Sequence, residues 1–214
     1  MMLRHVLTVL FLNLATLAVA HPHVYVDGRI DFRFGDDTTL EMIELTWLYD
    51  PFETLYVLSS LEIDPGQDWT LSEDERAKLI AFESDWAGTF DGAARLKLKD
   101  TPIGLQPPTD FQVRLAGNRL EVRFKRALKE RLNLSQQRLD VAFYEDTFFF
   151  AFTIAEVPKF LGNVPDCLAS VIPFDPTAQS SALQSQLSQL GREEQPEDSN
   201  VGELFTDRIN LTCA

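Results

Sequence analysis

Two of the three histidines of this chain lie in one tripeptide, His21-Pro22-His23, directly after an apolar N-terminal stretch. If a peptidase cuts after Ala20, the new N-terminal amine, the imidazole of His21 and the imidazole of His23 come within reach of one ion. Such nitrogen donors bind zinc, nickel, cobalt and copper(II). Pro22 removes the backbone amide that a square-planar amine–amide–imidazole copper site would have to deprotonate. The tripeptide therefore predicts a transition-metal site, and the sequence does not choose among these four metals.

The segment after the tripeptide must position these ligands. Residues 24–34 alternate between apolar and polar side chains, which predicts a strand with one buried face. The polar face would carry His21, His23 and Asp27, and side chains two residues apart on one face stand about 6.5–7 Å apart. We therefore expect these three residues to be the metal ligands, with Glu145 or Asp146 able to approach from another strand. The apolar face consists of Val24, Val26, Ile30, Phe32 and Phe34.

Residues 1–20 have the pattern of a secretory signal peptide. Arg4 precedes an apolar core, and Ala18-Val19-Ala20 supplies the small residues that a signal peptidase accepts. The core is interrupted at Asn13 and is shorter than the ~20 residues that span a bilayer. The alternative is an uncleaved N-terminal anchor. We expect residues 21–214 to form a single exported domain, or two subdomains within it.

Composition and charge narrow the class of partner. The chain has 214 residues, of which 45% are hydrophobic, and this is enough apolar material for a hydrophobic core. Its net charge is −14. Cleavage would remove Arg4 and leave 18 basic against 33 acidic residues, so the charge becomes 18 − 33 = −15. Nucleic acid and anionic lipid would be repelled by this charge. No further segment is apolar enough to insert into a membrane after cleavage.

Cys167 and Cys213 are the two cysteines of the chain. In an oxidising compartment, such an even pair separated by a long loop predicts a disulfide. The bond would tie the strand-like segment 208–213 to the rest of the protein and would stabilise it by ~4 kcal/mol in the chain-entropy model.

A second pattern with metal-ligand chemistry spans residues 64–75. Its oxygen-bearing side chains have the spacing of positions 1, 5, 9 and 12 of a calcium loop, but Gly66 and Trp69 replace the acid and the glycine expected at positions 3 and 6. The competing interpretation is a loop followed by a helix capping box formed by Ser72 and Glu75. The candidate calcium ligands are Asp64, Asp68, Thr70, Ser72 and Glu75.

No catalytic constellation stands out. Glu145 and Asp146 are adjacent carboxylates, but a turn between two strands explains them equally well. Both histidines of the processed chain lie at its terminus, so a hydrolase triad is poorly supported, and there is no glycine-rich phosphate loop. We therefore expect a protein that is not an enzyme.

The rest of the chain predicts an α+β fold, a mostly antiparallel β-sheet or sandwich with one or two helices. Hairpins are expected over 24–48 and 111–124, with further strands at 95–99, 139–143, 148–154 and 208–213. The aromatic run 148–154 is expected to be buried on both faces. Helices are expected near 53–60, from Ser72 to Gly88 with Leu79, Phe82 and Trp86 as its apolar stripe, and near 181–190. Residues 191–200 indicate an exposed loop.

These residues carry a family resemblance that spans nearly the whole processed chain. The segments 21–27 (HPHVYVD), 45–50 (LTWLYD), 141–149 (VAFYEDTFF) and 206–213 (TDRINLTC) resemble domain-of-unknown-function family 1007. Tyr25 stands where that family usually has Trp or Phe. The resemblance implies a periplasmic component of an uncharacterised ABC-type transport system, of a kind often encoded beside nickel/cobalt-type permeases. It implies a membrane permease or ABC-type transporter component as the partner.

Two functions follow as expectations. The first is an accessory protein of a transition-metal transport system that binds zinc, nickel, cobalt or copper through the N-terminal His-Pro-His. The second is a metal-free interaction or assembly subunit whose polar strand face docks on membrane partners. A copper redox protein is a third alternative, but it would need a further histidine in addition to the two of the processed chain.

Overall fold

The computed structural model describes residues 22–86, 92–175, 177, 181–190, 194, 196 and 200–214. The predicted signal peptide, His21 and most of the predicted loop 191–200 lie outside these residues. No helix within the described ranges is long and apolar enough to cross a membrane.

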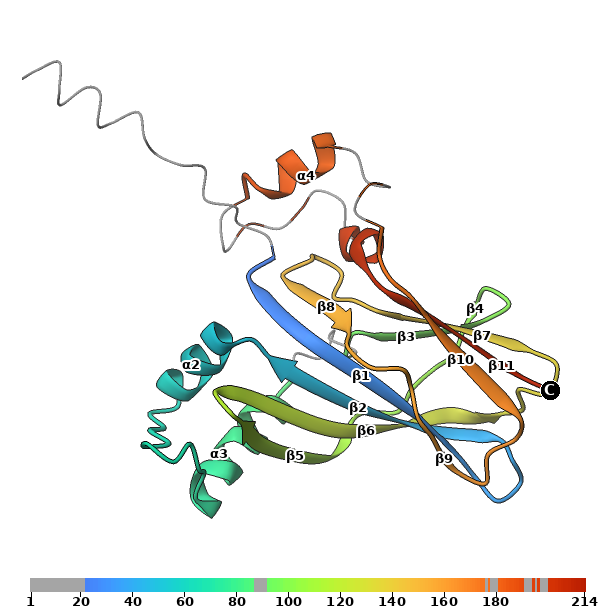
Figure 1. The fold of residues 1–214 in the computed structure, drawn as a ribbon, viewed down its shortest axis with the longest axis horizontal. Coiled ribbons are helices and arrows are strands. Elements are labelled where there is room, and N and C mark those ends of the chain that lie inside the picture. The colour runs from blue at the N-terminus through green and yellow to red at the C-terminus, as the bar shows by residue number, and fades with distance from the viewer. Residues whose placement is uncertain are drawn as a thin grey trace, which may run out of the picture.

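One sheet, sheet A, has the strand order β5-β6-β2-β1-β8, and β9 pairs with the far end of β1 (Figure 1). Its pairs are antiparallel except that β8 and β9 run parallel to β1. The strands are β1 (Val24–Phe34), β2 (Leu40–Tyr49), β5 (Thr109–Ala116), β6 (Arg119–Leu132), β8 (Phe150–Ile154) and β9 (Phe160–Gly162).

The second sheet, sheet B, is antiparallel with the order β10-β11-β7-β3-β4. Its strands are β10 (Cys167–Ile172), β11 (Arg208–Cys213), β7 (Arg138–Phe143), β3 (Ala94–Leu98) and the short β4 (Thr101–Pro102). The 3-10 helix η2 (Val201–Phe205) directly precedes β11.

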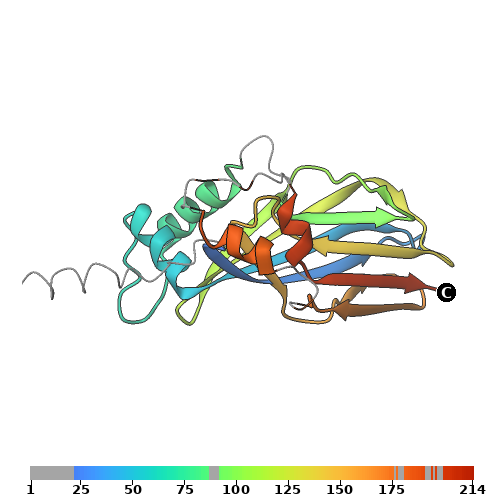
Figure 2. The ribbon, with the colours of Figure 1, turned by 90° about the horizontal axis from the view of Figure 1, so that it is seen from above.

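Three α-helices complete the described fold: α2 (Pro51–Ser60), α3 (Glu73–Ser84) and α4 (Ser181–Leu187). Helices α2 and α3 gather at one end of the molecule, beside the ends of β2, β5 and β6 (Figure 2). The capping box predicted at Ser72 and Glu75 begins α3, and Arg76 of α3 donates a hydrogen bond of 2.8 Å to the carbonyl of Val113 in β5. The described residues thus contain a helix in each of the three regions where one was expected, so the overall expectation of one or two helices was too low.

The core contains side chains from both sheets. The predicted apolar face of β1 is buried, with each of its five residues at most 2% exposed. Trp47 of β2 packs edge-on against Phe124 of β6, with ring centroids 4.9 Å apart. Phe143 of β7 stacks on Phe152 of β8 at 4.6 Å and lies against Gly28, where a Cβ atom would collide with its ring. The small residue in β1 therefore makes room for an aromatic side chain of the other sheet.

These observations confirm an α+β fold with mostly antiparallel strands, while a β-sandwich stays a prediction. Three details were wrong. Helix α3 ends at Ser84, so Trp86 is not part of its apolar stripe, and the predicted end at Gly88 lies outside the described residues. Phe82 is 45% exposed because α3 buries Leu79 and Glu83 instead. The run 148–154 is not buried on both faces, because Thr153 is exposed whereas its neighbours Phe152 and Ile154 are buried.

Candidate functional site

His23 lies immediately before β1, half-buried. Its backbone N–H donates to the carbonyl of Phe149 at 3.0 Å, and its ring packs on the ring of Phe149 with centroids 5.1 Å apart. The N–H of Phe149 in turn donates to Oε2 of Glu145 at 3.0 Å. The backbone of Phe149 therefore links His23 to Glu145, one of the two carboxylates expected to approach it. His21, its predicted co-ligand, lies outside the described residues.

Asp27, the third predicted ligand, forms an ion pair. Nη1 of Arg119 in β6 donates to Oδ2 of Asp27 at 2.6 Å. The same guanidinium donates to the carbonyls of Tyr49 at 2.6 Å and Leu48 at 2.8 Å. Arg119 thus links β6, β2 and β1 of sheet A, and the carboxylate of Asp27 accepts the hydrogen bond that ties β1 into this link.

Among the residues that the structure describes, no three His, Cys, Asp or Glu side chains lie close enough to hold a metal ion. The segment 64–75 uses its oxygens locally. Oδ1 of Asp64 accepts from the N–H of Gly66 at 3.0 Å. Oε2 of Glu75 accepts from the N–H of Ser72 at 2.8 Å, as a capping box requires. In the structure Ser72 and Glu75 therefore contact each other. The acidic candidates Asp64, Asp68 and Glu75 do not form one cluster that could hold a metal ion.

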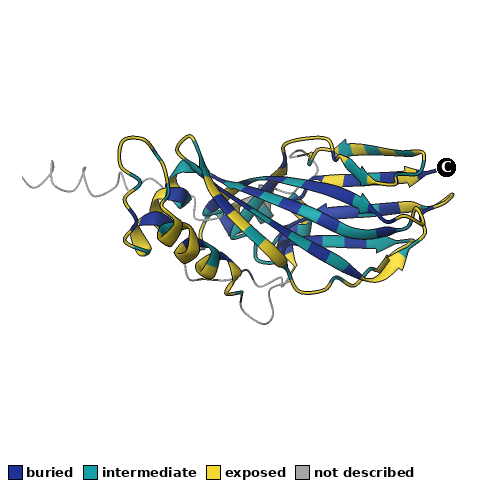
Figure 3. Ribbon diagram, turned by 90° about the horizontal axis from the view of Figure 1, so that it is seen from below, coloured by how far each residue is buried: buried dark blue, intermediate teal, exposed yellow. Residues whose placement is uncertain are grey.

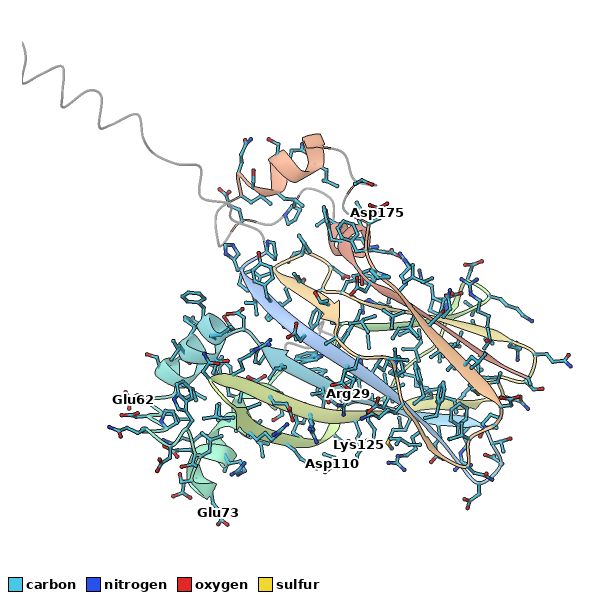
Figure 4. All side chains as sticks on the ribbon, in the orientation of Figure 1. Arg29, Glu62, Glu73, Asp110, Lys125 and Asp175 are labelled. Atoms are coloured by element: carbon cyan, nitrogen blue, oxygen red, sulfur yellow. A yellow bond between two sulfur atoms is a disulfide. The ribbon has the colours of Figure 1, made fainter. Side chains whose placement is uncertain are left out.

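The polar face of β1 belongs to a wider charged face of sheet A (Figure 4). Its charges are largely paired with one another: Arg29 with Asp31 at 3.2 Å, Arg33 with Glu44 at 2.6 Å, and Lys125 with Asp110 at 2.5 Å. Asp31 is only 5% exposed and also accepts from the N–H of Lys159 at 2.9 Å. A shallow hollow of about 160 Å³ on this face is lined by Arg29, Asp31, Glu44, Asp110, Arg123 and Lys125. Three of these residues are cations and three are anions, so the hollow offers no excess of either sign to a charged ligand.

Cys167 and Cys213 form the predicted disulfide. They lie directly opposite each other in the register of β10 and β11, with Cα atoms 4.0 Å apart. The bond is consistent with export to an oxidising compartment. It also joins the edge strand of sheet B to the C-terminal strand.

Helix α2 carries a surface that the sequence did not reveal. One of its faces is buried through Thr54, Val57 and Leu58. The opposite face exposes Phe52 (85%), Leu55 (52%) and Tyr56 (56%), which we call the α2 surface. Both sets have the spacing i, i+3, i+4 of a helix face, so the sequence pattern could not tell which face is buried. Figure 3 shows exposed residues along the helices at this end of the molecule.

Hydrogen bonds fix the position of helix α2 against sheet A. Asp50 is the N-cap of the helix, and its carboxylate accepts from the backbone N–H groups of Phe52 (2.7 Å) and Glu53 (3.0 Å). It also accepts from the N–H of Tyr25 in β1 at 2.9 Å. Within the helix, the buried hydroxyl of Thr54 accepts from the N–H of Leu120 at 2.8 Å. Asp50 and Thr54 thus connect α2 to β1 and β6, and the apolar residues on the opposite face of the helix point outward.

The surroundings of the α2 surface are strongly acidic. Residues 50–86, which form both helices and their loop, contain ten acidic side chains and two basic ones, Arg76 and Lys78. The net charge of this segment is therefore 2 − 10 = −8, more than half of the −14 of the whole chain.

One of these acids, Glu83, is buried where α3 packs on sheet A and is only 5% exposed. The hydroxyl of Tyr49 in β2 donates to Oε2 of Glu83 at 2.9 Å, whereas Oε1 has no hydrogen-bond partner within the described residues. Burial raises the pKa of Glu83 to about 7, the Tyr49 hydrogen bond opposes the rise, and the charge of Glu53 on α2 adds to it. Burial likewise raises the pKa of Tyr49 well above its ordinary value. The helical end is thus anchored to the sheet through a proton-sensitive contact.

The comparisons with known proteins assign the chain to a family. A family model described as "Protein of unknown function (DUF1007)" matches residues 6–213, so the chain belongs to this family. No curated protein matches the sequence.

Proposed function

We propose that this member of the DUF1007 family is an exported, periplasmic interaction subunit of a membrane transport complex, with the α2 surface as its docking site. The observation that carries the proposal is the exposure of Phe52, Leu55 and Tyr56 side by side on a helix whose other face is anchored in the core. Adjacent exposed aromatic and aliphatic side chains are the usual composition of the centre of a protein interface. The disulfide supports the periplasmic location.

Charge narrows the chemistry of the partner. The α2 surface is surrounded by a segment of net charge −8, so a complementary partner has an apolar socket rimmed by Lys and Arg. An anionic lipid surface is disfavoured by the same charge. We therefore propose a protein partner, namely an extracytoplasmic part of a membrane-embedded transport component, in line with the association that the family resemblance implies.

Co-sedimentation with membranes tests this proposal in cells that produce the protein with its natural partners. We expect the native protein to appear partly in the membrane fraction and the variant Phe52→Ser/Leu55→Ser/Tyr56→Ser to be retained there about tenfold less, because the apolar contact is lost. The control is Val157→Ser, which removes an apolar side chain that is 64% exposed elsewhere. Equal retention of the triple variant and the native protein would contradict the proposal, as would absence of the native protein from the membrane fraction.

A second candidate is the metal-binding accessory predicted from His21 and His23. It rests on His23, which the backbone of Phe149 links to Glu145. Both oxygens of Glu145 already accept hydrogen bonds, from Thr147 and Phe149, so a metal ion would have to compete for them. Zinc, nickel, cobalt or copper(II) would be the cargo.

Calorimetric titration of the processed protein with each metal ion tests this second candidate. The double variant His21→Ala/His23→Ala is expected to lose binding, and affinity is expected to fall below pH ~6.5 as protons compete for the imidazoles. Equal affinity in the two proteins, or no binding below millimolar metal, would leave docking as the function.

A further inference from the structure

Strand β10 ends sheet B and exposes one of its edges. All six of its residues pair with β11, from Cys167 opposite Cys213 to Ile172 opposite Arg208. Within the described part of the chain no strand pairs with its other edge, and Figure 2 shows β10 at the border of the molecule. Its outward side chains include Leu168, 74% exposed, and Ile172, 47% exposed.

The other end strands that the structure describes are protected in the ways that natural sheets use against unwanted pairing. Strands β4 and β9 have only two and three residues. Strand β5 carries Asp110 and Arg114. The edge of β8 is covered by Asp207, whose Oδ2 accepts from the N–H of Ile154 at 2.8 Å. Strand β10, with the sequence CLASVI, has no charge and no proline. An open, uncharged and apolar edge is a template for another strand.

The edge is also fixed in place before any partner arrives. The Cys167–Cys213 bond joins β10 to β11 at one end of their register. At the other end, the N–H of Phe174 donates to Oδ1 of Asp207 at 2.7 Å. A strand that is already ordered loses little conformational freedom when another strand pairs with it.

We infer that β10 pairs antiparallel with β10 of a second copy of this chain, about a two-fold axis at Ser170. In this register Ser170 faces Ser170 of the second copy, and Leu168 faces Ile172 of the second copy. Both copies thus bury the apolar side chains that β10 exposes when alone. A two-fold arrangement is the commonest symmetry of soluble oligomers.

The register, rather than charge, favours a second copy as the occupant of this edge, because Leu168 faces Ile172 in both halves of the pair. Two chains of net charge −14 repel each other over most of their surfaces. Strand β10 adds nothing to this repulsion, because it is uncharged and its flanking acids do not meet. The two-fold register places Asp166 opposite Phe174, and Asp175 opposite Pro165, of the other copy. This pairing uses a surface different from the α2 surface and does not depend on the proposed docking function.

Analytical ultracentrifugation of the processed, disulfide-bonded protein tests the pairing. We expect a monomer–dimer equilibrium in the native protein. Ser170→Lys places two lysines directly opposite each other and should weaken dimerisation about fivefold or more. The matched control Thr153→Lys adds the same charge at an exposed position of edge strand β8 and should leave the dimer intact. Circular dichroism verifies that each variant is folded.

A charge-pair exchange tests the register itself. Leu168→Lys alone and Ile172→Glu alone should each weaken the dimer, whereas the double variant should restore it, because each lysine then faces a glutamate of the other copy. A native protein that is monomeric up to millimolar concentration would overturn the inference. A dimer that Ser170→Lys does not weaken, or a double variant no better than the single ones, would also overturn it.

Discussion

At the scale of single residues, Glu83 is a group whose ionisation is strongly coupled to the fold. Its pKa of about 7 in the folded protein compares with 4.5 for an ordinary glutamate. The folded protein therefore holds a proton that the unfolded chain has already lost over this pH range. The stability that the protonated form provides is complete below pH 4.5, and is lost as the pH rises to about 7.

We predict that Glu83→Gln flattens this dependence. The native protein should lose up to about 3 kcal/mol of unfolding free energy over this pH window, and the variant should lose much less. Urea unfolding at a series of pH values measures the difference. Glu73→Gln, on the exposed first turn of the same helix, is the control and should keep the native slope. Parallel profiles for native protein and Glu83→Gln would show that Glu83 does not carry the effect.

The predicted metal ligands show what sequence reasoning misses at this scale. Alternation correctly placed Asp27 on the polar face of β1, but the partner that takes its carboxylate, Arg119, comes from a strand more than ninety residues later. Short-range spacing carries no information on such a contact. The link between His23 and Glu145 through Phe149 is non-local in the same way, although both residues were noted as chemically suitable.

At the scale of elements, Asp50 caps the N-terminus of α2 and connects this helix to β1. Its carboxylate accepts three backbone N–H groups, two in the helix and one in β1. We predict that Asp50→Ala lowers the unfolding free energy by about 1–2 kcal/mol and speeds proteolytic cleavage near α2, because the cap and the link to β1 are lost together. Asp50→Asn keeps an oxygen acceptor and should lose less. Chemical denaturation with limited proteolysis measures both effects; an unchanged stability in Asp50→Ala would refute the role of Asp50.

The disulfide is the second feature that belongs to this scale. We predict that Cys167→Ala/Cys213→Ala lowers the unfolding free energy by about 2–5 kcal/mol, because the closed loop spans 46 residues of separation. Denaturant unfolding measures the loss. In the native protein, thiol labelling after unfolding without reductant should find no free thiol. Two labelled thiols per chain would mean that the bond is absent from the native protein.

At the scale of the whole molecule, local periodicity predicted most elements, including β1, β2, the β5–β6 hairpin, α3 and the final strand. It missed β10 and β9, because β10 has no clean alternation of apolar and polar residues and β9 is only three residues long. The parallel pairing of β8 and β9 with β1 also could not be predicted, since it joins segments far apart in sequence. The α2 surface was missed because its residues and the buried face of the helix have the same helical spacing.

The most direct test of the docking function is site-specific photo-crosslinking in cells that produce the protein with its natural partners. A photoreactive amino acid replaces Phe52, which is 85% exposed at the start of the α2 surface, and a matched probe replaces Gln112 on β5. Mass spectrometry then identifies the crosslinked proteins. We predict that the probe at position 52 captures an integral membrane transport component through a region rich in Lys and Arg, and that the probe at position 112 does not. Capture of the same proteins from both positions, or no membrane protein from position 52, would contradict the account.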